Sequence, residues 1–198
     1  MTQYKIKADV NEVLELTERI AESIGLKGAD ALRLRLLAEE MMSMIQAIAG
    51  EFSAEFRIEH EGKDCRLCLS AKSDLDYAKR KELLSVSTSG KNTARIGIME
   101  KIRGIFEAGL WGMGEGLAMQ AEYAPYVGGY GLVGIGDGIS GAMYSWSMQK
   151  YKTDVQAEND SDAWDELEKS IIANIADEVS VGVRRDGVEL TVHKNFGV

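Results

Sequence analysis

Two adjacent carboxylates, Glu39 and Glu40, are the first candidates for chemistry in this chain, because they lie in an apolar segment with helical spacing. Met44 follows Glu40 at the distance of one helical turn, so a helix places these two side chains on the same face. Such a pair could line a ligand site. The alternative is that Glu39 and Glu40 form only the solvated face of an amphipathic helix.

Two further groups of polar residues follow. Asp74 and Asp76 lie after a predicted strand, in a stretch that an ordinary acidic loop explains. A later polar loop contains Gly90, Lys91 and Gly97 and leads into a helix. Backbone N–H groups and the helix dipole favour an anion at such a point. A solvated loop before an ordinary helix explains the same residues.

These candidates must be positioned by the elements around them. Alternating residues predict a strand at about 4–8, and helical spacing predicts a helix at about 10–24. A second helix is expected to be capped by Asp30 and to end at Gly50. Its predicted inner face consists of Leu34, Leu37, Met41, Met44, Ile45 and Ile48.

Two hairpins and a sheet covered by helices complete the prediction. Gly62 lies in the turn of the first hairpin, and Asp186-Gly187 forms the turn of the second. A helix is expected at about 96–106 between them. This order predicts an α+β fold, a two-layer sandwich in which helices cover one face of a mainly antiparallel sheet. We expect a single domain over residues 1–198.

Glycine is concentrated in one part of the chain, which has 21 Gly and one Pro. Many of these glycines lie at about 109–150, a segment rich in aromatic and Met residues and almost free of charge. No strand and helix frame them as in a phosphate-binding loop, and Pro125 and Asp137 disfavour a membrane helix. We expect an insertion that serves as a lid or as a surface for a partner or a second copy. A final helix is predicted to begin at Ser161 or Asp162.

The composition excludes several classes of function. A net charge of -9 argues against nucleic acid, because binding a polyanion needs a basic surface. With two Cys and two His there is no disulfide framework, and a zinc site would need Cys65, Cys68, His60 and His193 together. The first residues lack the apolar core of a signal peptide, so a cytoplasmic location without membrane contact is expected.

With this order of elements, the segment 34–45 and the turn before it resemble the GHKL ATPases, in particular the branch of anti-sigma factors and serine kinases related to histidine-kinase ATPase domains. In that family the helix reads Glu-x-x-x-Asn. The Glu activates water or the attacking hydroxyl, and the Asn holds magnesium between the phosphates. The resemblance assigns the catalytic position to Glu40 and the Asn position to Met44. A thioether is a soft ligand, whereas magnesium prefers hard oxygen.

The resemblance also implies where ATP would bind, namely between the second helix and the sheet. Asp74 or Asp76 stands where the family's Asp accepts from the adenine amino group, although the family's neighbouring glycines are absent. The loop with Gly90, Lys91 and Gly97 stands at the phosphate-binding turn.

Two functions follow. The first is an ATP-binding regulatory protein that controls a protein partner, with ATPase or serine kinase activity left open by Met44. The alternative is a degenerate, non-catalytic member of the family that acts as a protein-binding module through the glycine-rich insertion. A homodimer is expected if the insertion packs against a second copy.

Overall fold

The computed structural model describes residues 1–48, 52–72, 97–111, 132–133, 144–184 and 187–197. Along the chain its elements are β1 (Thr2–Lys7), α1 (Val10–Ser23), α2 (Ala29–Gln46), β2 (Ser53–Glu61), β3 (Asp64–Lys72), α4 (Ile98–Trp111), β4 (Leu132–Val133), β5 (Tyr144–Ser147), α7 (Met148–Glu158), α8 (Ser161–Lys169), α9 (Ile171–Ile175), β6 (Glu178–Arg184) and β7 (Gly187–Asn195).

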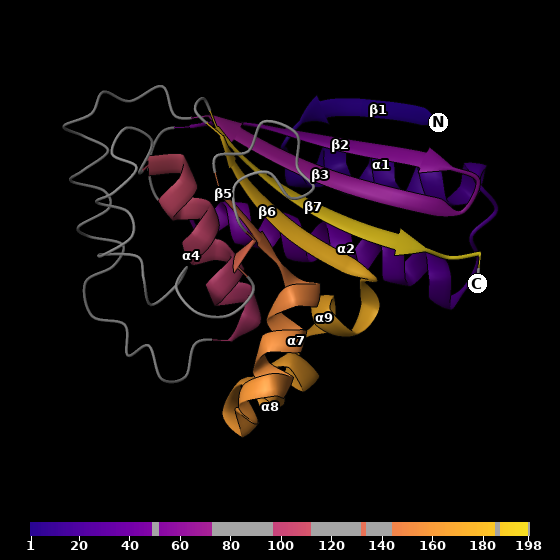
Figure 1. The fold of residues 1–198 in the computed structure, drawn as a ribbon. Helices are drawn as coiled ribbons and strands as arrows, with labels where there is room; N and C mark the ends of the chain where they lie inside the picture. Colours follow the sequence, from indigo (N-terminus) through magenta and orange to yellow (C-terminus); the bar gives the residue numbers. More distant parts are fainter. Residues whose placement is uncertain (49–51, 73–96, 112–131, 134–143, 185–186, 198) are drawn as a thin grey trace.

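The described strands form a seven-stranded sheet in the order β1-β2-β3-β7-β6-β5-β4, and each neighbouring pair is antiparallel. Helices α1 and α2 lie behind this sheet in Figure 1, α4 lies at its left and contacts β6, β7 and α2, and α7 to α9 extend from the end where β5 and β6 meet them. The predicted α+β sandwich, with helices on one face of an antiparallel sheet, is confirmed.

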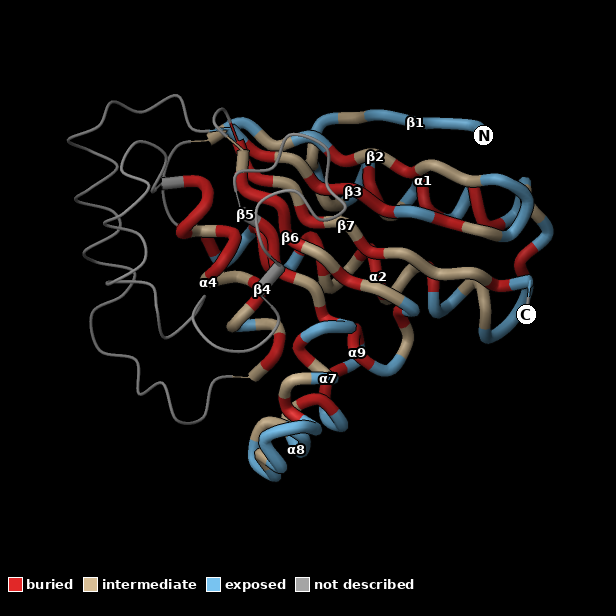
Figure 2. The backbone as a smooth tube through the Cα atoms, viewed as in Figure 1, coloured by how far each residue is buried: buried red, intermediate tan, exposed pale blue. Residues whose placement is uncertain are grey.

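The core lies between the sheet and the helix layer (Figure 2). Alternate residues of each strand point toward the helices, so directly opposite residues build apolar rows across the sheet. The longest fully buried row joins Phe56, Leu69, Leu190, Val181 and Trp146. All six residues of the predicted inner face of the second helix are buried, which confirms that prediction.

The start of α1 agrees with the sequence prediction, whereas the start of α2 does not. Asp9 caps α1 by accepting hydrogen bonds from the N–H groups of its first turn. At α2, Gly28 is the capping residue with φ 56°, and Asp30 lies within the first turn, 2.9 Å from Arg33. The positive φ of Gly28 turns the chain directly into the helix, so the Asp30 side chain is not needed as a cap. Gly50, the predicted end of the helix, lies outside the described residues.

The single helix predicted near the C-terminus is wrong, because two short helices replace it. Asp160, rather than Ser161 or Asp162, caps α8 by accepting from the N–H of Ala163 at 3.0 Å. The chain leaves the helix at Ser170, whose hydroxyl accepts from a backbone N–H of α9 at 3.3 Å. A serine side chain that bonds nearby backbone competes with helix continuation, which accounts for the break.

Part of the segment predicted as an insertion belongs to the sandwich. The end of α4, strands β4 and β5 and the first residues of α7 all fall within 109–150. Strand β5 pairs with β6, and Trp146 on β5 is fully buried. The remaining residues of this segment, 112–131 and 134–143, lie outside the described part of the chain.

Gly187 begins β7, and its role differs from the one predicted for it. An Asp-Gly turn predicts a glycine with positive φ, but among the described residues only Gly25, Gly28 and Gly62 are glycines with positive φ. A Cβ on Gly187 would lie 2.7 Å from the carbonyl oxygen of Ala71. Glycine at this position therefore permits the close approach of two strands.

We expect Gly187→Ala to lower the free energy of unfolding by about 1–3 kcal/mol, because the backbone of a paired strand cannot move aside easily. Urea denaturation would measure the change. The matched control is Gly197→Ala, where the nearest atom is the side-chain oxygen of Asn195 at 3.1 Å. That oxygen accepts from the N–H of Gly197 at 2.8 Å, but it ends a flexible side chain that can shift slightly without losing this bond, so a change within about 0.5 kcal/mol is expected. Equal stability of the two variants would contradict the close approach at Gly187.

Candidate functional site

The predicted catalytic pair lies on α2, but its two side chains have different surroundings. Glu40 is partly exposed, and no described residue forms a hydrogen bond or ion pair with it. Its neighbour Glu39 accepts a hydrogen bond from Arg35 at 2.9 Å. Met44 is only 4% exposed and packs in the core. The spacing therefore places Glu40 at the border of the core and Met44 inside it.

Gly97, the predicted end of the phosphate-binding turn, immediately precedes α4. A Cβ on Gly97 would lie 3.4 Å from the Oε2 atom of Glu166, which belongs to α8. A carboxylate near a helix N-terminus interacts favourably with the helix dipole. The other oxygen of this carboxylate lies 3.5 Å from the Nζ atom of Lys169, so the position at which a phosphate was expected already faces a carboxylate with its own cation.

Four other predicted nucleotide-binding residues, Asp74, Asp76, Gly90 and Lys91, lie outside the described residues. The structure places α4 beside α2 on the same face of the sheet, so Gly97 precedes a helix that neighbours the one carrying Glu40 (Figure 1). The association of Glu40 with the other four residues stays a prediction.

A network of charged side chains covers the face of the sheet opposite the helices. Arg57 lies 2.9 Å from Glu59 and 3.5 Å from Glu189. Glu189 also accepts from the hydroxyl of Ser70 at 2.9 Å and lies 3.5 Å from Arg184. Opposite charges balance one another within this network, which is the expected property of a structural ion-pair cluster.

Sequence reasoning did not find this network. Strand alternation could have placed Arg57 and Glu59 on the polar face of β2. The pairing of β3 with β7, however, brings together residues that are far apart in the chain, such as Ser70 and Glu189. Register between distant strands cannot be read from a local pattern.

The two cysteines lie on opposite faces of β3, and both are buried. Burial raises the pKa of the Cys65 thiol to about 11, and the Asp64 carboxylate adds to this shift. Burial also raises the pKa of the Cys68 thiol, although the Arg57 guanidinium and the Thr191 hydroxyl act in the opposite direction. Neither thiol has the lowered pKa of a reactive cysteine.

We expect both thiols to resist Ellman's reagent in the folded protein at mildly alkaline pH and to react in concentrated guanidinium chloride. The Cys65 thiol of the unfolded chain ionises near its ordinary pKa of 9.0, whereas that of the folded chain ionises near 11. Protons are then lost first by the unfolded state, so stability should fall as pH rises through this window. Rapid labelling of either thiol in the folded protein would contradict the burial.

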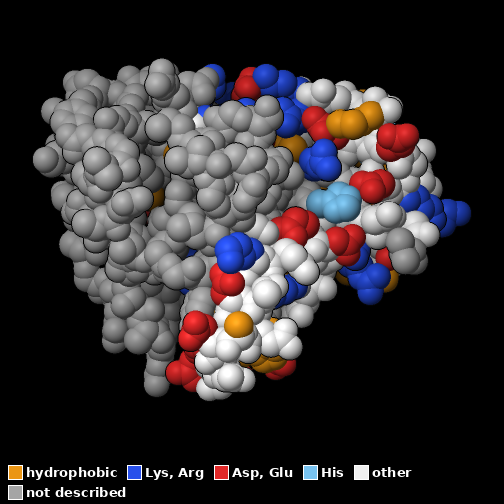
Figure 3. All heavy atoms as spheres, in the orientation of Figure 1, with side chains coloured by type: hydrophobic (Ala, Val, Ile, Leu, Met, Phe, Trp, Pro, Cys, Tyr) orange, Lys and Arg blue, Asp and Glu red, His pale blue; other side chains and the backbone are white. Residues whose placement is uncertain are grey.

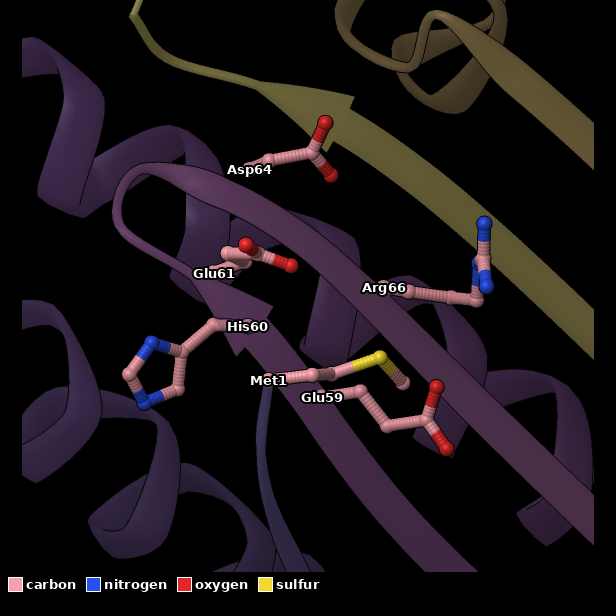
Figure 4. A pocket seen from close by; sticks show the side chains of 6 residues that line it. All are labelled: Met1, Glu59, His60, Glu61, Asp64 and Arg66. Atoms are coloured by element: carbon pink, nitrogen blue, oxygen red, sulfur yellow. The ribbon is translucent and has the colours of Figure 1, made fainter.

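A cavity of about 410 Å³ lies at the turn of the β2–β3 hairpin (Figure 4). Two of its carboxylates already have partners, because Asp64 lies 2.8 Å from the Nε2 atom of His193 and Glu59 pairs with Arg57. The ring of His60 points away from the other labelled side chains in Figure 4. The cavity is lined by Met1, Glu59, His60, Glu61, Asp64 and Arg66.

Among the described residues there is no group of three or more His, Cys, Asp or Glu side chains that could hold a metal ion. None of the described helices has the length and apolar character needed to cross a membrane. Comparisons of the chain with protein-family models, with curated proteins and with solved structures found no match.

Proposed function

We propose that this chain is a regulatory protein with a GHKL-like sandwich that does not transfer phosphate and acts by binding a protein partner. The burial of Met44 is the observation that carries this proposal, since its side chain packs in the core at the position of the family's magnesium ligand. A thioether in an apolar environment offers magnesium no oxygen. Without the metal, the family's phosphoryl transfer lacks a central component.

The carboxylate near α4 supports the same proposal. Glu166 lies close to the residue that precedes this helix, where the resemblance expects phosphate. Two negative groups at one helix N-terminus repel each other. A phosphate would have to displace the Glu166 side chain or bind elsewhere.

The proposed partner contact involves the glycine-rich segment within 109–150. Its aromatic and Met residues with little charge are typical of an adaptable interface. We further propose a cytoplasmic location, because the described cysteines are free thiols, as a reducing compartment keeps them. A homodimer formed by this segment is part of the proposal.

Isothermal titration with ATP, with and without magnesium, tests the proposal directly. We expect no difference between the two titrations and no phosphate release. Partner binding and oligomeric state should be compared between the natural chain and a variant in which a Gly/Ser linker replaces residues 112–131. This replacement keeps α4 and β5, whereas deletion of 109–150 would remove the buried Trp146. An unchanged mass and an unchanged set of bound partners would contradict the interface.

The second candidate function is an ATP-binding regulatory protein in which Glu40 acts as the base. The observation that favours it is that Glu40 is partly exposed and lacks a partner among the described residues. Magnesium-dependent ATP binding that is abolished by Glu40→Ala and retained by Glu39→Ala would establish this function and overturn the first. Glu39 is the matched control, because it lies on the same helix and already pairs with Arg35.

A further inference from the structure

Strand β1 forms one edge of the sheet, and its outer side is free in the described structure (Figure 1). It pairs with β2 without a bulge from Thr2 to Lys7. Five of its six residues are exposed. A regular edge of this kind presents a row of backbone groups to any strand that could pair with it.

The register shows which backbone groups point outward. The N–H of Ala8 donates to the carbonyl oxygen of Ala54 at 3.0 Å, directly beyond the β1–β2 ladder. Hydrogen-bonded and non-hydrogen-bonded pairs alternate in an antiparallel ladder. Tyr4 and Ile6 therefore also direct their backbone groups toward β2.

Gln3, Lys5 and Lys7 consequently direct their backbone groups away from the sheet. The carbonyl oxygen of Lys7 already accepts from the N–H of Asp9 at 2.8 Å. The N–H and C=O groups of Gln3 and Lys5 and the N–H of Lys7 are left for an added strand. Three donors and two acceptors at alternate residues match the pattern that a strand requires.

The charge of this edge is opposite to that of the whole chain. Lys5 and Lys7 are the charged residues of β1, in a chain with a net charge of -9. Lys5 pairs with Glu55 of β2 at 2.8 Å, and no described residue pairs with Lys7. Basic and acidic side chains lie side by side along the upper edge of the molecule in Figure 3.

The positive charge of Lys5 and Lys7 determines which kind of strand can pair with the free edge of β1. Pairing of β1 with β1 of a second copy would bring four lysine side chains together across two strands, and lysines at an edge are known to oppose such pairing. An acidic strand would instead place carboxylates opposite Lys5 and Lys7. On the other side of β1, Tyr4 is 39% exposed and stacks on His60, and Ile6 packs at the border of the core. These two residues would contact apolar side chains of the added strand.

We propose that the free edge of β1 binds an extended segment of a partner protein in which acidic and apolar residues alternate. The segment adds a strand to the sheet, its backbone pairs with Gln3, Lys5 and Lys7, and its carboxylates lie beside the lysines. This interface consists of β1 residues and does not depend on a bound nucleotide.

The test uses the full chain, isotopically labelled for NMR, and a capped synthetic peptide of repeated Glu-Val units. We expect the amides of Gln3, Lys5 and Lys7 to exchange rapidly in the free protein and to become protected when the peptide binds. The amides of Tyr4 and Ile6 should be protected in both states. A capped Lys-Val peptide is the control and should bind at least about tenfold more weakly, since like charges repel. Equal binding of the two peptides, or protection confined to other elements, would overturn the proposal.

Two variants distinguish the contribution of backbone hydrogen bonds to peptide binding from that of the lysine charge. Gln3→Pro removes one outward N–H, which an edge strand tolerates, and should weaken peptide binding about fivefold relative to Gln3→Ala, the factor expected for one net hydrogen bond. Lys7→Glu should weaken binding of the acidic peptide and strengthen binding of the basic one. Amide spectra would verify that each variant is folded. If neither variant changes binding, or if the free chain forms a dimer that Gln3→Pro dissociates, the acidic-peptide proposal is wrong.

Discussion

The Met44→Asn variant is expected to lose at least about 3 kcal/mol of stability and to gain no magnesium-dependent ATP binding. Removing a buried Met side chain costs about 2–5 kcal/mol, and a buried amide without partners adds about 1–3 kcal/mol. Met44 is 4% exposed and is surrounded by core residues, so the new amide would have few partners. Urea denaturation gives the stability, and titration with ATP and magnesium gives the binding.

Two controls make this result interpretable. Met44→Leu keeps the volume and apolar character of the side chain, so a loss below about 1.5 kcal/mol is expected. Glu40→Gln lies at a partly exposed position and should change stability by no more than about 0.5 kcal/mol. A Met44→Asn variant as stable as the natural chain and able to bind magnesium with ATP would show that this position faces a nucleotide site, in contradiction to the proposed function.

The Trp146→Ala variant is expected to lower the free energy of unfolding by about 3–5 kcal/mol. Trp146 is fully buried on β5, where its ring lies 5.9 Å from that of Tyr151 on α7. Its removal would leave a large cavity between the sheet and α7. Urea denaturation followed by circular dichroism would measure the loss.

Trp164→Ala is the matched control, because Trp164 is 40% exposed on α8 and should contribute less than about 1 kcal/mol. Trp146→Phe should be tolerated better than Trp146→Ala, because the ring of Phe fills part of the cavity that Ala would leave. Neither substitution breaks a hydrogen bond of the Nε1 atom, which is buried without a partner in the described structure. Equal losses for Trp146→Ala and Trp164→Ala would mean that β5 is not part of the cooperative core.

The sequence predicted those parts of the fold whose patterns repeat locally. The inner face of α2 and the strands of both hairpins follow from the spacing of apolar residues, because burial on one face imposes a period of 3.6 or 2 residues. The helix ends were less predictable. Asp160, Ser161 and Asp162 are adjacent residues that all favour capping, and only the folded chain selects Asp160.

Strand β5 and helix α7 were missed for a different reason. The glycines around Trp146 dominate the composition, and the four residues of β5 are too few to show alternation against that background. The candidate site was predicted to a similar extent. The one-turn spacing of Glu40 and Met44 follows from the sequence, but the burial of Met44 depends on the sheet beneath α2. The approach of Glu166 to Gly97 depends on the path of α7 and α8.

The two points at which the α7–α9 segment leaves and re-enters the sheet lie side by side, which affects how this segment can vary in evolution. The chain leaves the sheet at Ser147 and returns at Glu178, and the hydroxyl of Ser147 donates to the Glu178 carboxylate at 2.9 Å. The entry and exit of this excursion are thus held together by neighbouring strands rather than by the helices. The entropic cost of closing a loop rises only slowly with the length of the loop. Natural variation could therefore shorten or extend helix α8 while the contact between Ser147 and Glu178 and the sheet stay unchanged.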